Sequence, residues 1–531
     1  MNYNSLIFWV MFGVIYLIYW KVNHRKQNLL LLVASYIFYG FWDYRFLFLV
    51  LLSTIIDFIG GLGVAGREIP SRQRYRLGGL LVGTALVLCT PLSRGRLPHQ
   101  LSDIAIPLGT LVAVLAYGGL LPYLYALPEA KRRRAFLIIS MVANLAILAF
   151  FKYFNFFLSS LQTALHLFGI TDIPLPLLNI ILPAGISFYT FQAMSYTIDI
   201  WRKEIEPTSN FQDFALFVCF FPHLVAGPIM RGHTLLPQVI QERTRRQGDT
   251  EEGLILVLLG MFKKLVIADN MAPIANAVFY RFTEGTAAGL SGSEVLLGVY
   301  AFAFQIYGDF SGYSSIARGI SRWLGFELAI NFRNPYLAVS PSDFWQRWHI
   351  SLSSWLRDYL YIPLGGNRQG TARTYGNLLW TMVLGGLWHG ASGTFIAWGF
   401  YHGMILCLFR FFKVPDPKSW FSIQLRRVLM FHLVCLGWLF FRADTLSAAF
   451  QMLKRIVTPG KIPPFALSSL MMILVHCIPI LIFEALTKDE SQYVRFYEKT
   501  WLKKSVIYSA LIITTIILNG GQSSEFIYFQ F

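Results

Sequence analysis

The chain has 531 residues, of which 55% are hydrophobic and 14% are charged, and its mean hydropathy is +0.52. Soluble globular domains carry about 25% charged residues, so this composition excludes a soluble globular protein and indicates a polytopic membrane protein. The net charge of +17 does not indicate nucleic-acid binding, because the basic residues lie in short clusters between apolar runs, as the positive-inside rule produces. The five cysteines are isolated, so we expect neither a disulfide framework nor a metal site.

Six apolar runs are predicted to form the first membrane helices. They span residues 6–20, 29–41, 47–64, 80–92, 104–127 and 135–157. The first run has neither a basic segment before it nor a cleavage site after it, so we expect a retained helix with its N-terminus outside. The fourth and fifth runs form an out-and-back pair that leaves the topology unchanged, so residues 77–130 are predicted to be a helical-pair insertion.

The next runs contain polar residues that a lipid-facing helix would not carry. Residues 180–201 are predicted to be broken or packed against protein. Residues 211–230 hold His223 between two prolines and are predicted to be re-entrant, with a structural role for the histidine. Further polar residues stand in the runs at 254–267 and 295–320.

The remaining apolar runs complete the predicted fold. They span residues 395–412, 428–441, 470–485 and 506–518. We expect roughly 11–14 apolar segments, a few of them re-entrant, in a single all-α membrane domain over residues 1–531. Because the last run begins beside two lysines, the C-terminal tail, residues 521–531, is predicted to be extracytoplasmic.

A helix-start signal stands at Ser340, a residue type that caps helices, which is followed by Pro341 and Asp343. One continuous helix is predicted to follow, with aromatic residues on one face, polar residues on the other and His349 at the border, so we expect it to lie in the interface or to line a cavity floor. Its tryptophans are interpreted as interfacial anchors; they are Trp345, Trp348 and Trp355. Nearby arginines suit either interfacial anchoring or binding of the phosphates of a nucleotide-containing donor; they are Arg347, Arg357, Arg368 and Arg373.

His389 lies in a largely apolar run, residues 377–391, and four neighbouring glycines let backbone or ligand approach closely. A buried imidazole stays neutral, which is the state that a general base requires. The alternative is a buried histidine hydrogen-bonded to a neighbouring carbonyl, and the residue pattern leaves both readings open.

Several blocks of the sequence resemble the membrane-bound O-acyltransferase (MBOAT) family, and within it the membrane subunits of bacterial alginate O-acetylation. The blocks are FPHLVAGP at 221–228, DFSGYS at 309–314, NFRNPY at 331–336, residues 343–366 with WLRDYLYIPLGG at 355–366, GGLWHGA at 385–391 and FIYFQF at 526–531. The resemblance covers nearly the whole chain apart from the predicted insertion. It implies an MBOAT-like helical fold with a central tunnel.

The resemblance also assigns roles to single residues. It implies that His389 is the central catalytic base and that His349 is an accessory histidine that orients or polarises a reacting group. It further suggests the hypothesis that Tyr528 receives the acyl group before a partner protein takes it. The alternative for Tyr528 is an aromatic anchor at the membrane interface.

Other residues are expected to support this site. Asp309 is expected to orient a histidine or to form a structural pair with Arg318 or Arg322. Supporting roles are also expected for the neighbours of the two histidines; these are Trp345, Arg347 and Trp388. The residues expected to bind the donor are Arg357, Arg368 and Arg373.

The activity that the resemblance implies is O-acylation of an extracytoplasmic polysaccharide. An acyl group, most often acetyl, would come from acetyl-CoA or another acyl thioester, such as one on an acyl carrier protein, on the cytoplasmic side; we expect no permanently bound cofactor. A separate extracytoplasmic transferase is expected as a partner, because nothing in the chain resembles a soluble polysaccharide-modifying domain. The expected location is the bacterial inner membrane, with both termini extracytoplasmic. A polysaccharide or small-molecule transporter or flippase is the alternative, since discontinuous helices with polar groups at membrane depth are also its signature.

Overall fold

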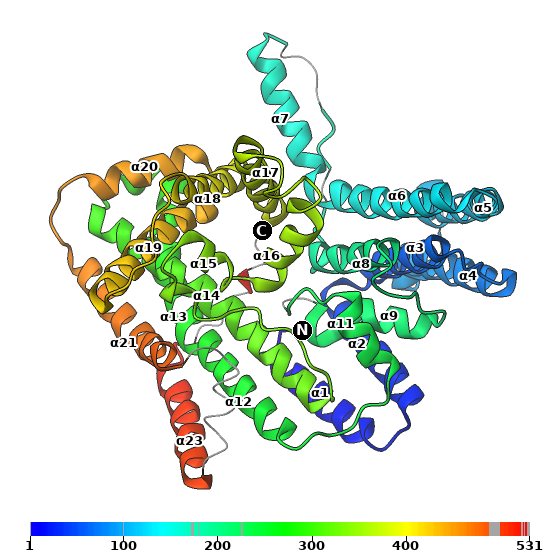
Figure 1. Cartoon of the computed structure of the whole chain (residues 1–531), viewed down its shortest axis with the longest axis horizontal. Coiled ribbons are helices and arrows are strands. Elements are labelled where there is room, and N and C mark those ends of the chain that lie inside the picture. The colour runs from blue at the N-terminus through cyan, green and yellow to red at the C-terminus, as the bar shows by residue number, and fades with distance from the viewer. Residues whose placement is uncertain are drawn as a thin grey trace. The chain divides into compact units, whose positions relative to one another are not determined.

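The computed structural model describes residues 2–98, 100–170, 175–178, 180–224, 227–487, 500–521, 524 and 526–527. Every regular element within these residues is helical, which confirms the all-α prediction (Figure 1). The contacts divide the chain into two compact units: unit 1 comprises Met1–Val225 and Ile229–Thr244, and unit 2 comprises Ala226–Pro228 and Arg245–Phe531. The single membrane domain expected from the sequence stays a prediction.

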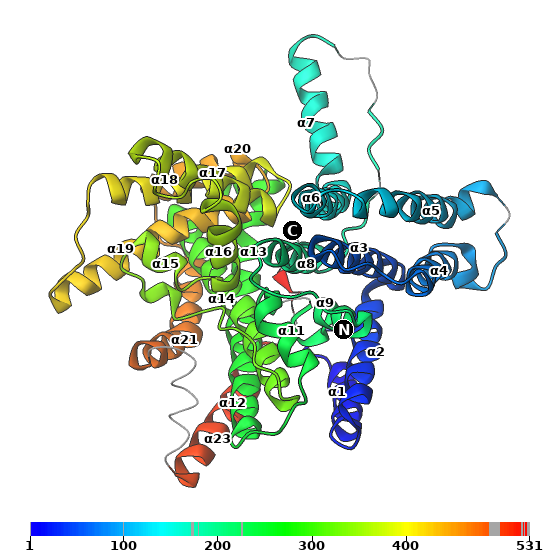
Figure 2. The ribbon, with the colours of Figure 1, turned by 45° about the vertical axis from the view of Figure 1, so that its right-hand side comes forward.

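Unit 1 consists of eleven α-helices and four short 3-10 or π segments within its described residues. The α-helices are α1 (Leu6–Tyr19), α2 (His24–Asp43), α3 (Leu47–Ala65), α4 (Ser71–Leu88), α5 (Ala105–Tyr125), α6 (Glu129–Leu148), α7 (Phe154–Leu167), α8 (Ile186–Trp201), α9 (Phe211–Cys219), α10 (Phe221–Leu224) and α11 (Gly232–Ile240). The short segments are η1 (Tyr44–Phe46), η2 (Pro91–Arg94), η3 (Leu101–Ile104) and the π turn η4 (Ala149–Tyr153). The predicted helical pair forms α4 and α5, which pack on each other (Figure 2).

The core of unit 1 lies between α3, α6 and α8, which pack side by side (Figures 1 and 2). A buried polar network joins these helices around Asp57 of α3. Ser140 and Asn144 of α6 and Thr197 of α8 all donate hydrogen bonds to the Asp57 carboxylate, from Asn144 Nδ2 at 2.8 Å and from Thr197 Oγ1 at 3.2 Å. Nearly every residue of α8 is buried, which confirms that the polar run at 180–201 packs against protein.

Unit 2 contains the longest helix. Its α-helices are α12 (Asp249–Phe262), α13 (Asp269–Thr283), α14 (Gly292–Trp323), α15 (Pro341–Trp345), α16 (Ile350–Leu356), α17 (Thr371–His389), α18 (Gly393–Phe411), α19 (Trp420–Arg442), α20 (Leu446–Val457), α21 (Pro464–Leu486) and α23 (Trp501–Leu518). Its short segments are the π turns η5 (Lys263–Ala268) and η8 (Arg357–Tyr361), and the 3-10 turns η6 (Ala287–Gly289) and η7 (Pro335–Leu337).

The 32-residue helix α14 is buried over most of its length and packs against α12 and α13. It begins with a capping box, in which the Ser291 side chain accepts from the Glu294 N–H and the Glu294 side chain accepts from the Ser291 N–H. Glycines bring the backbones of α12 and α14 together: a Cβ atom on Gly260 would lie 2.5 Å from the carbonyl oxygen of Gly312. The polar run at 295–320 is therefore a helix surrounded by protein.

Seven helical stretches of the described residues are long and apolar enough to cross a membrane, which confirms the prediction of a polytopic membrane protein. They are His24–Ala65, Leu101–Tyr125, Glu129–Leu167, Gly393–Phe411, Trp420–Arg442, Pro464–Leu486 and Trp501–Leu518. Leu6–Tyr19 and Phe211–Leu224 are shorter apolar stretches. The second of these is interrupted at Phe220, whose non-helical backbone, with φ of −52° and ψ of 108°, separates α9 from α10.

Candidate active site

The helix that starts after Ser340 is interrupted at His349. The Ser340 hydroxyl accepts a hydrogen bond from the Asp343 N–H at 3.1 Å, so the predicted cap is confirmed. The prediction of one continuous amphipathic helix is wrong, because α15 ends at Trp345, α16 begins at Ile350, and His349 between them has a φ of +43°.

The interruption has a tertiary cause, which is Asn331 of the NFRNPY block. The N–H of Ile350 donates to the Asn331 carbonyl at 2.9 Å, and the N–H and hydroxyl of Ser351 donate to Asn331 Oδ1 at 3.2 and 2.9 Å. These bonds replace the bonds that a continuous helix would give to the first turn of α16. The left-handed conformation of His349 is thus held by a residue that lies outside the helix.

His349 is fully buried, and its Nδ1 lies 3.1 Å from Asn331 Oδ1. The two donors of Ser351 on the same atom identify it as the amide oxygen, which only accepts hydrogen bonds. The proton of the neutral imidazole therefore sits on Nδ1, and the lone pair sits on Nε2. The Phe310 ring packs perpendicular to the imidazole, with 4.6 Å between the ring centroids and 89° between the planes.

His389 is the last residue of α17 and is 5% exposed. Its ring centroid lies 6.4 Å from that of His349, so the fold of unit 2 brings the two predicted histidines together. Trp388, Trp398 and Phe441 surround the His389 ring edge-on at 4.9, 5.2 and 5.2 Å.

The glycines on either side of His389 serve helix packing. A Cβ atom on Gly386 would lie 2.2 Å from the carbonyl oxygen of Phe395, and one on Gly390 would lie 2.0 Å from the Phe395 ring. Only glycine allows α17 to approach α18 this closely. The close approach places His389 against Trp398 of α18.

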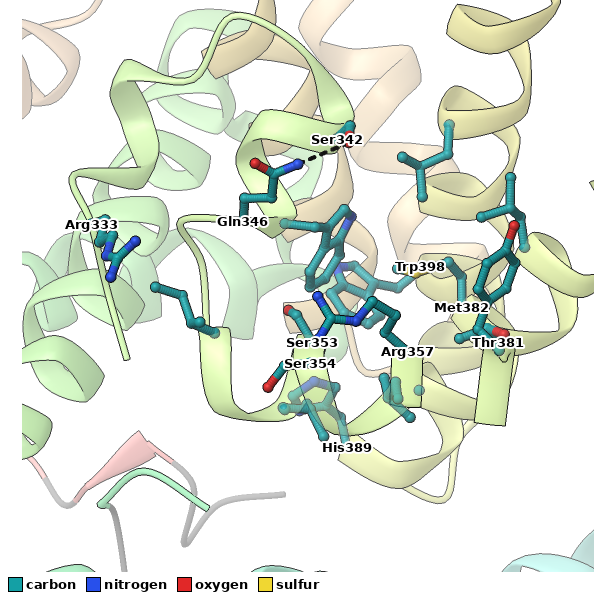
Figure 3. A pocket seen from close by; sticks show the side chains of 18 residues that line it. Arg333, Ser342, Gln346, Ser353, Ser354, Arg357, Thr381, Met382, His389 and Trp398 are labelled. Atoms are coloured by element: carbon teal, nitrogen blue, oxygen red, sulfur yellow. Dashed lines mark hydrogen bonds between the residues drawn. The ribbon is translucent and has the colours of Figure 1, made fainter. Parts of the chain in front are cut away.

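A cavity of about 500 Å³ opens onto His389 (Figure 3). Its wall combines apolar and aromatic side chains with two guanidinium groups, those of Arg333 and Arg357. Figure 3 shows Ser353, Ser354, Arg357 and His389 among the side chains that line the cavity. His349 is not among the residues that line the cavity, so the two histidines differ in their access to it.

The other residues predicted for the site occupy different surroundings. Trp345 is half-buried and lines the cavity, and Trp388 packs on His389. Arg347 lies outside the cavity lining; its Nε pairs with Asp343 Oδ1 at 2.6 Å. The interpretation of Trp348 and Trp355 as interfacial anchors is wrong, because their side chains are 1% and 5% exposed and pack inside unit 2.

Of the three arginines predicted to bind the donor, only Arg357 lines the cavity. Its guanidinium forms two hydrogen bonds with the Asp358 carboxylate, at 2.6 and 3.1 Å, and this pairing raises the pKa of Arg357. The exposed residues Arg368 and Arg373 lie outside the cavity lining. The cavity also takes in Arg333, which the sequence reasoning missed although it stands within the NFRNPY block.

Asp309 forms its ion pair with Lys264, whose Nζ lies 2.8 Å from Asp309 Oδ1, and not with either predicted arginine. The prediction of Arg322 as the partner is wrong, since Arg322 pairs with Glu252 at 3.1 Å. The π turn η5 and the close packing of α12 on α14 bring Lys264 to Asp309, and a turn of this kind is hard to recognise in a sequence. Lys264 also pairs with Asp269 at 2.9 Å.

Three further expectations concern Tyr528, a metal site and His223. Tyr528, the hypothetical acyl relay, lies outside the described residues. Within the part of the chain that is described, no group of three or more His, Cys, Asp and Glu side chains could hold a metal ion. The predicted structural role of His223 agrees with its buried hydrogen bond to Gln192, with Nε2 2.7 Å from Oε1.

Comparison with known proteins places the chain in a family. Residues 202–441 match the membrane-bound O-acyltransferase family. The chain is 38% identical over 456 residues to the probable alginate O-acetylase AlgI of Azotobacter vinelandii, covering 85% of this chain and 77% of that protein. It is 37% identical over 469 residues to the corresponding protein of Pseudomonas aeruginosa, covering 87% of this chain and 75% of that protein. It is also 33% identical over 447 residues to the peptidoglycan O-acetyltransferase of Helicobacter pylori, covering 75% of this chain and 83% of that protein. With this degree of identity over most of its length, the chain is a multi-pass O-acyltransferase that belongs to the membrane-bound O-acyltransferase family.

Proposed function

We propose that this protein moves an acyl group, in the simplest case acetyl, from a cytoplasmic thioester for the O-acylation of an extracytoplasmic polysaccharide. The observation that carries the proposal is the cavity of about 500 Å³ that opens onto His389. The ring of the buried His349 lies 6.4 Å from that of His389, between centroids. Two of the relatives are named for O-acetylation of different polymers, alginate and peptidoglycan. Family membership favours this enzyme activity over the transporter or flippase that the sequence left open.

The chemistry assigned to the site is acyl transfer with His389 as general base. The His389 imidazole takes the proton of an attacking hydroxyl while the new C–O bond forms at the thioester carbonyl. The C–S bond then breaks, and the same proton passes to the departing thiolate. His349, whose Nδ1 proton is directed at Asn331, is held in one tautomer and one orientation, as a group that orients a reacting atom must be.

The donor we propose is acetyl-CoA or an acyl group on a carrier protein, because the cavity suits an acylated arm that ends in phosphate. Its apolar wall matches an acyl group and its thioester, while the guanidinium groups of Arg333 and Arg357 suit phosphate oxygens. Arg357 is charged whenever the donor binds, since its pairing with Asp358 raises its pKa. Donor-binding roles for Arg368 and Arg373 stay predictions.

The acceptor side of the proposal involves Tyr528 and a partner. Tyr528 would receive the acyl group as a phenyl ester, and a separate extracytoplasmic transferase would pass it to the polymer. This arrangement requires the inner membrane, a passage through the protein and extracytoplasmic termini. Intact-mass measurement after incubation with acetyl-CoA tests the relay: the wild-type chain gains one acetyl group, whereas Tyr528→Phe gains none. An adduct that persists in Tyr528→Phe would overturn the relay.

The main test of the function is His389→Ala, with His432→Ala as the matched control. His432 also lies in a helix of unit 2, but it bonds Tyr300 and the Val428 carbonyl and does not line the cavity. At equal expression in cells, His389→Ala should lower the acyl content of the polymer by about 100-fold or more, the usual effect of losing a general base. Unchanged acylation in His389→Ala would refute this site.

A further inference from the structure

Part of the C-terminal tail is docked inside unit 2. Phe526 and Ile527 are fully buried. The Phe526 ring stacks on Tyr313 of α14, with 4.4 Å between the centroids and 29° between the planes. The segment Ser524, Phe526 and Ile527, called the docked segment below, is therefore part of the core of unit 2.

Three buried charged residues bind the backbone of the docked segment. Lys264 Nζ donates to the Ser524 carbonyl at 2.8 Å, while Asp269 Oδ1 accepts from the Ser524 N–H at 3.2 Å and from its hydroxyl at 2.5 Å. Asp309 Oδ2 accepts from the Ile527 N–H at 2.6 Å. The side chains of this ion cluster, Lys264, Asp269 and Asp309, are at most 2% exposed.

The charges of the ion cluster explain why it needs the docked segment. One ammonium group faces two carboxylates, so a negative charge is left to be satisfied by hydrogen-bond donors. The backbone N–H groups of Ser524 and Ile527 supply those donors. Buried ion clusters contribute little net stability compared with apolar residues of similar size, so stability alone does not account for this one. Recognition of the docked segment accounts for the presence of the ion cluster.

The docked segment lies close to the proposed accessory histidine. The centroid of the Phe526 ring is 6.3 Å from that of Phe310, and Phe310 packs perpendicular to the His349 ring, with 4.6 Å between those centroids. One aromatic ring, that of Phe310, thus connects the docked segment to His349. In the sequence, Ile527 directly precedes Tyr528.

We propose that Lys264, Asp269 and Asp309 are positioning residues that hold the docked segment against Phe310, the ring that packs on His349, so that the acyl-transfer site is complete only when this segment is docked. The inference rests on the proposed function. It assigns a role in acyl transfer to an ion cluster that contacts neither the cavity nor His389.

Docking of the segment can be measured separately from acyl transfer. Ile527→Cys keeps the backbone N–H, and in the wild-type protein residue 527 is fully buried, so a maleimide should label it slowly in detergent-solubilised protein whose five native cysteines are replaced by serine. Addition of Asp309→Leu removes the acceptor for the Ile527 N–H and leaves Lys264 and Asp269 as a balanced pair. Labelling should then become about 10-fold faster or more, the effect of losing one charge-assisted hydrogen bond.

Acyl transfer to the polymer should fall in parallel, by about 10-fold or more, in Asp309→Leu. The matched control is Asp249→Leu, which removes a buried carboxylate of unit 2 that accepts from the Arg246 N–H at 2.8 Å and is not in contact with the docked segment. This control should change neither the labelling of the thiol at position 527 nor acyl transfer. Asp309→Leu with slow labelling, or with fast labelling and full acyl transfer, would overturn the proposal.

A second test changes the docked segment itself and leaves Lys264, Asp269 and Asp309 unchanged. Ile527→Pro removes the N–H that Asp309 accepts, whereas Ile527→Val keeps it. Acyl transfer should fall at least about 5-fold further in Ile527→Pro than in Ile527→Val, since only the proline leaves the carboxylate without this donor. Equal effects of the two substitutions would contradict the assigned role of the Ile527 N–H.

The outcome for His389→Ala separates this inference from the proposed function. If both are correct, His389→Ala loses acyl transfer while the thiol at position 527 stays protected, and Asp309→Leu loses both acyl transfer and protection. If His389→Ala retains acyl transfer, the proposed function fails. If His389→Ala loses acyl transfer but Asp309→Leu does not, only the positioning role fails.

Discussion

Two buried carboxylates, Asp57 in unit 1 and Asp309 in unit 2, are satisfied in different ways. Asp57 accepts hydrogen bonds from three neutral side chains of α6 and α8, so its partners are other helices of unit 1. Asp309 faces the ammonium group of Lys264 and the backbone N–H of Ile527, which is 218 residues away in the chain. The neutral network joins helices to one another, whereas the ion cluster also binds Ser524 and Ile527 of the docked segment.

The largest effect in this comparison is expected from Lys264→Met. The substitution leaves Asp269 and Asp309 close together with no cation between them, and breaking a buried ion pair in this way costs about 3–5 kcal/mol. Thermal unfolding of the solubilised protein should shift strongly to lower temperature, and adding Asp309→Leu to the same chain should restore part of the loss. A Lys264→Met protein as stable as wild type would contradict the assigned ion cluster.

An intermediate effect is expected from Asp57→Leu, which leaves donors of Ser140, Asn144 and Thr197 facing an apolar side chain. Ser140 Oγ keeps Thr197 Oγ1 as an acceptor at 3.3 Å, and Asn144 Nδ2 keeps the Ser140 carbonyl at 3.0 Å, so about one buried donor is left unsatisfied, at a cost of about 1–3 kcal/mol. Asp57→Asn retains one acceptor oxygen and should cost about 1 kcal/mol, with acyl transfer maintained once expression is matched. If Asp57→Asn abolished acyl transfer in a stable protein, the network would have a role beyond joining helices.

The smallest effect is expected from Ser53→Ala. The Ser53 hydroxyl donates a single hydrogen bond to Asn144 Oδ1 at 2.8 Å, at the edge of the Asp57 network. Loss of one such bond between neutral groups costs about 0.5–1.5 kcal/mol. The unfolding temperature should fall slightly, and acyl transfer should not change. A loss of stability as large as that of Asp57→Leu would show that the hydrogen bonds of the network do not contribute independently.

Residue patterns predicted part of the candidate site in unit 2. His349 and His389 were predicted as a pair from their sequence blocks, and their ring centroids lie 6.4 Å apart. The helix before His349 was predicted with its cap but without its interruption, because Asn331 caps α16 from outside the helix. The residue pattern of 340–359 cannot predict this contact, because Asn331 lies outside that stretch.

Partner choice was the least predictable property. Asp309 was expected to orient a histidine or to pair with an arginine of its own helix, since helical spacing is all that a sequence offers for choosing an ion-pair partner. Lys264 reaches it only because α12 crosses α14 at glycines and continues as a π turn. The tryptophans were misread for a related reason: Trp348 and Trp355 have a composition typical of membrane interfaces, but protein covers them.

The sequence by itself determined that this is an all-helical membrane protein, which of its helices are too polar to face lipid, and which two histidines belong to the candidate site. Hydropathy, helix caps and short motifs are local properties, because each depends only on residues that are close together in the chain. Tertiary structure alone decided that His389 lines the cavity and His349 does not. It also decided that Asp309 binds Lys264 and Ile527. These contacts join residues far apart in the chain, and they depend on how closely helix backbones approach, which no single segment specifies.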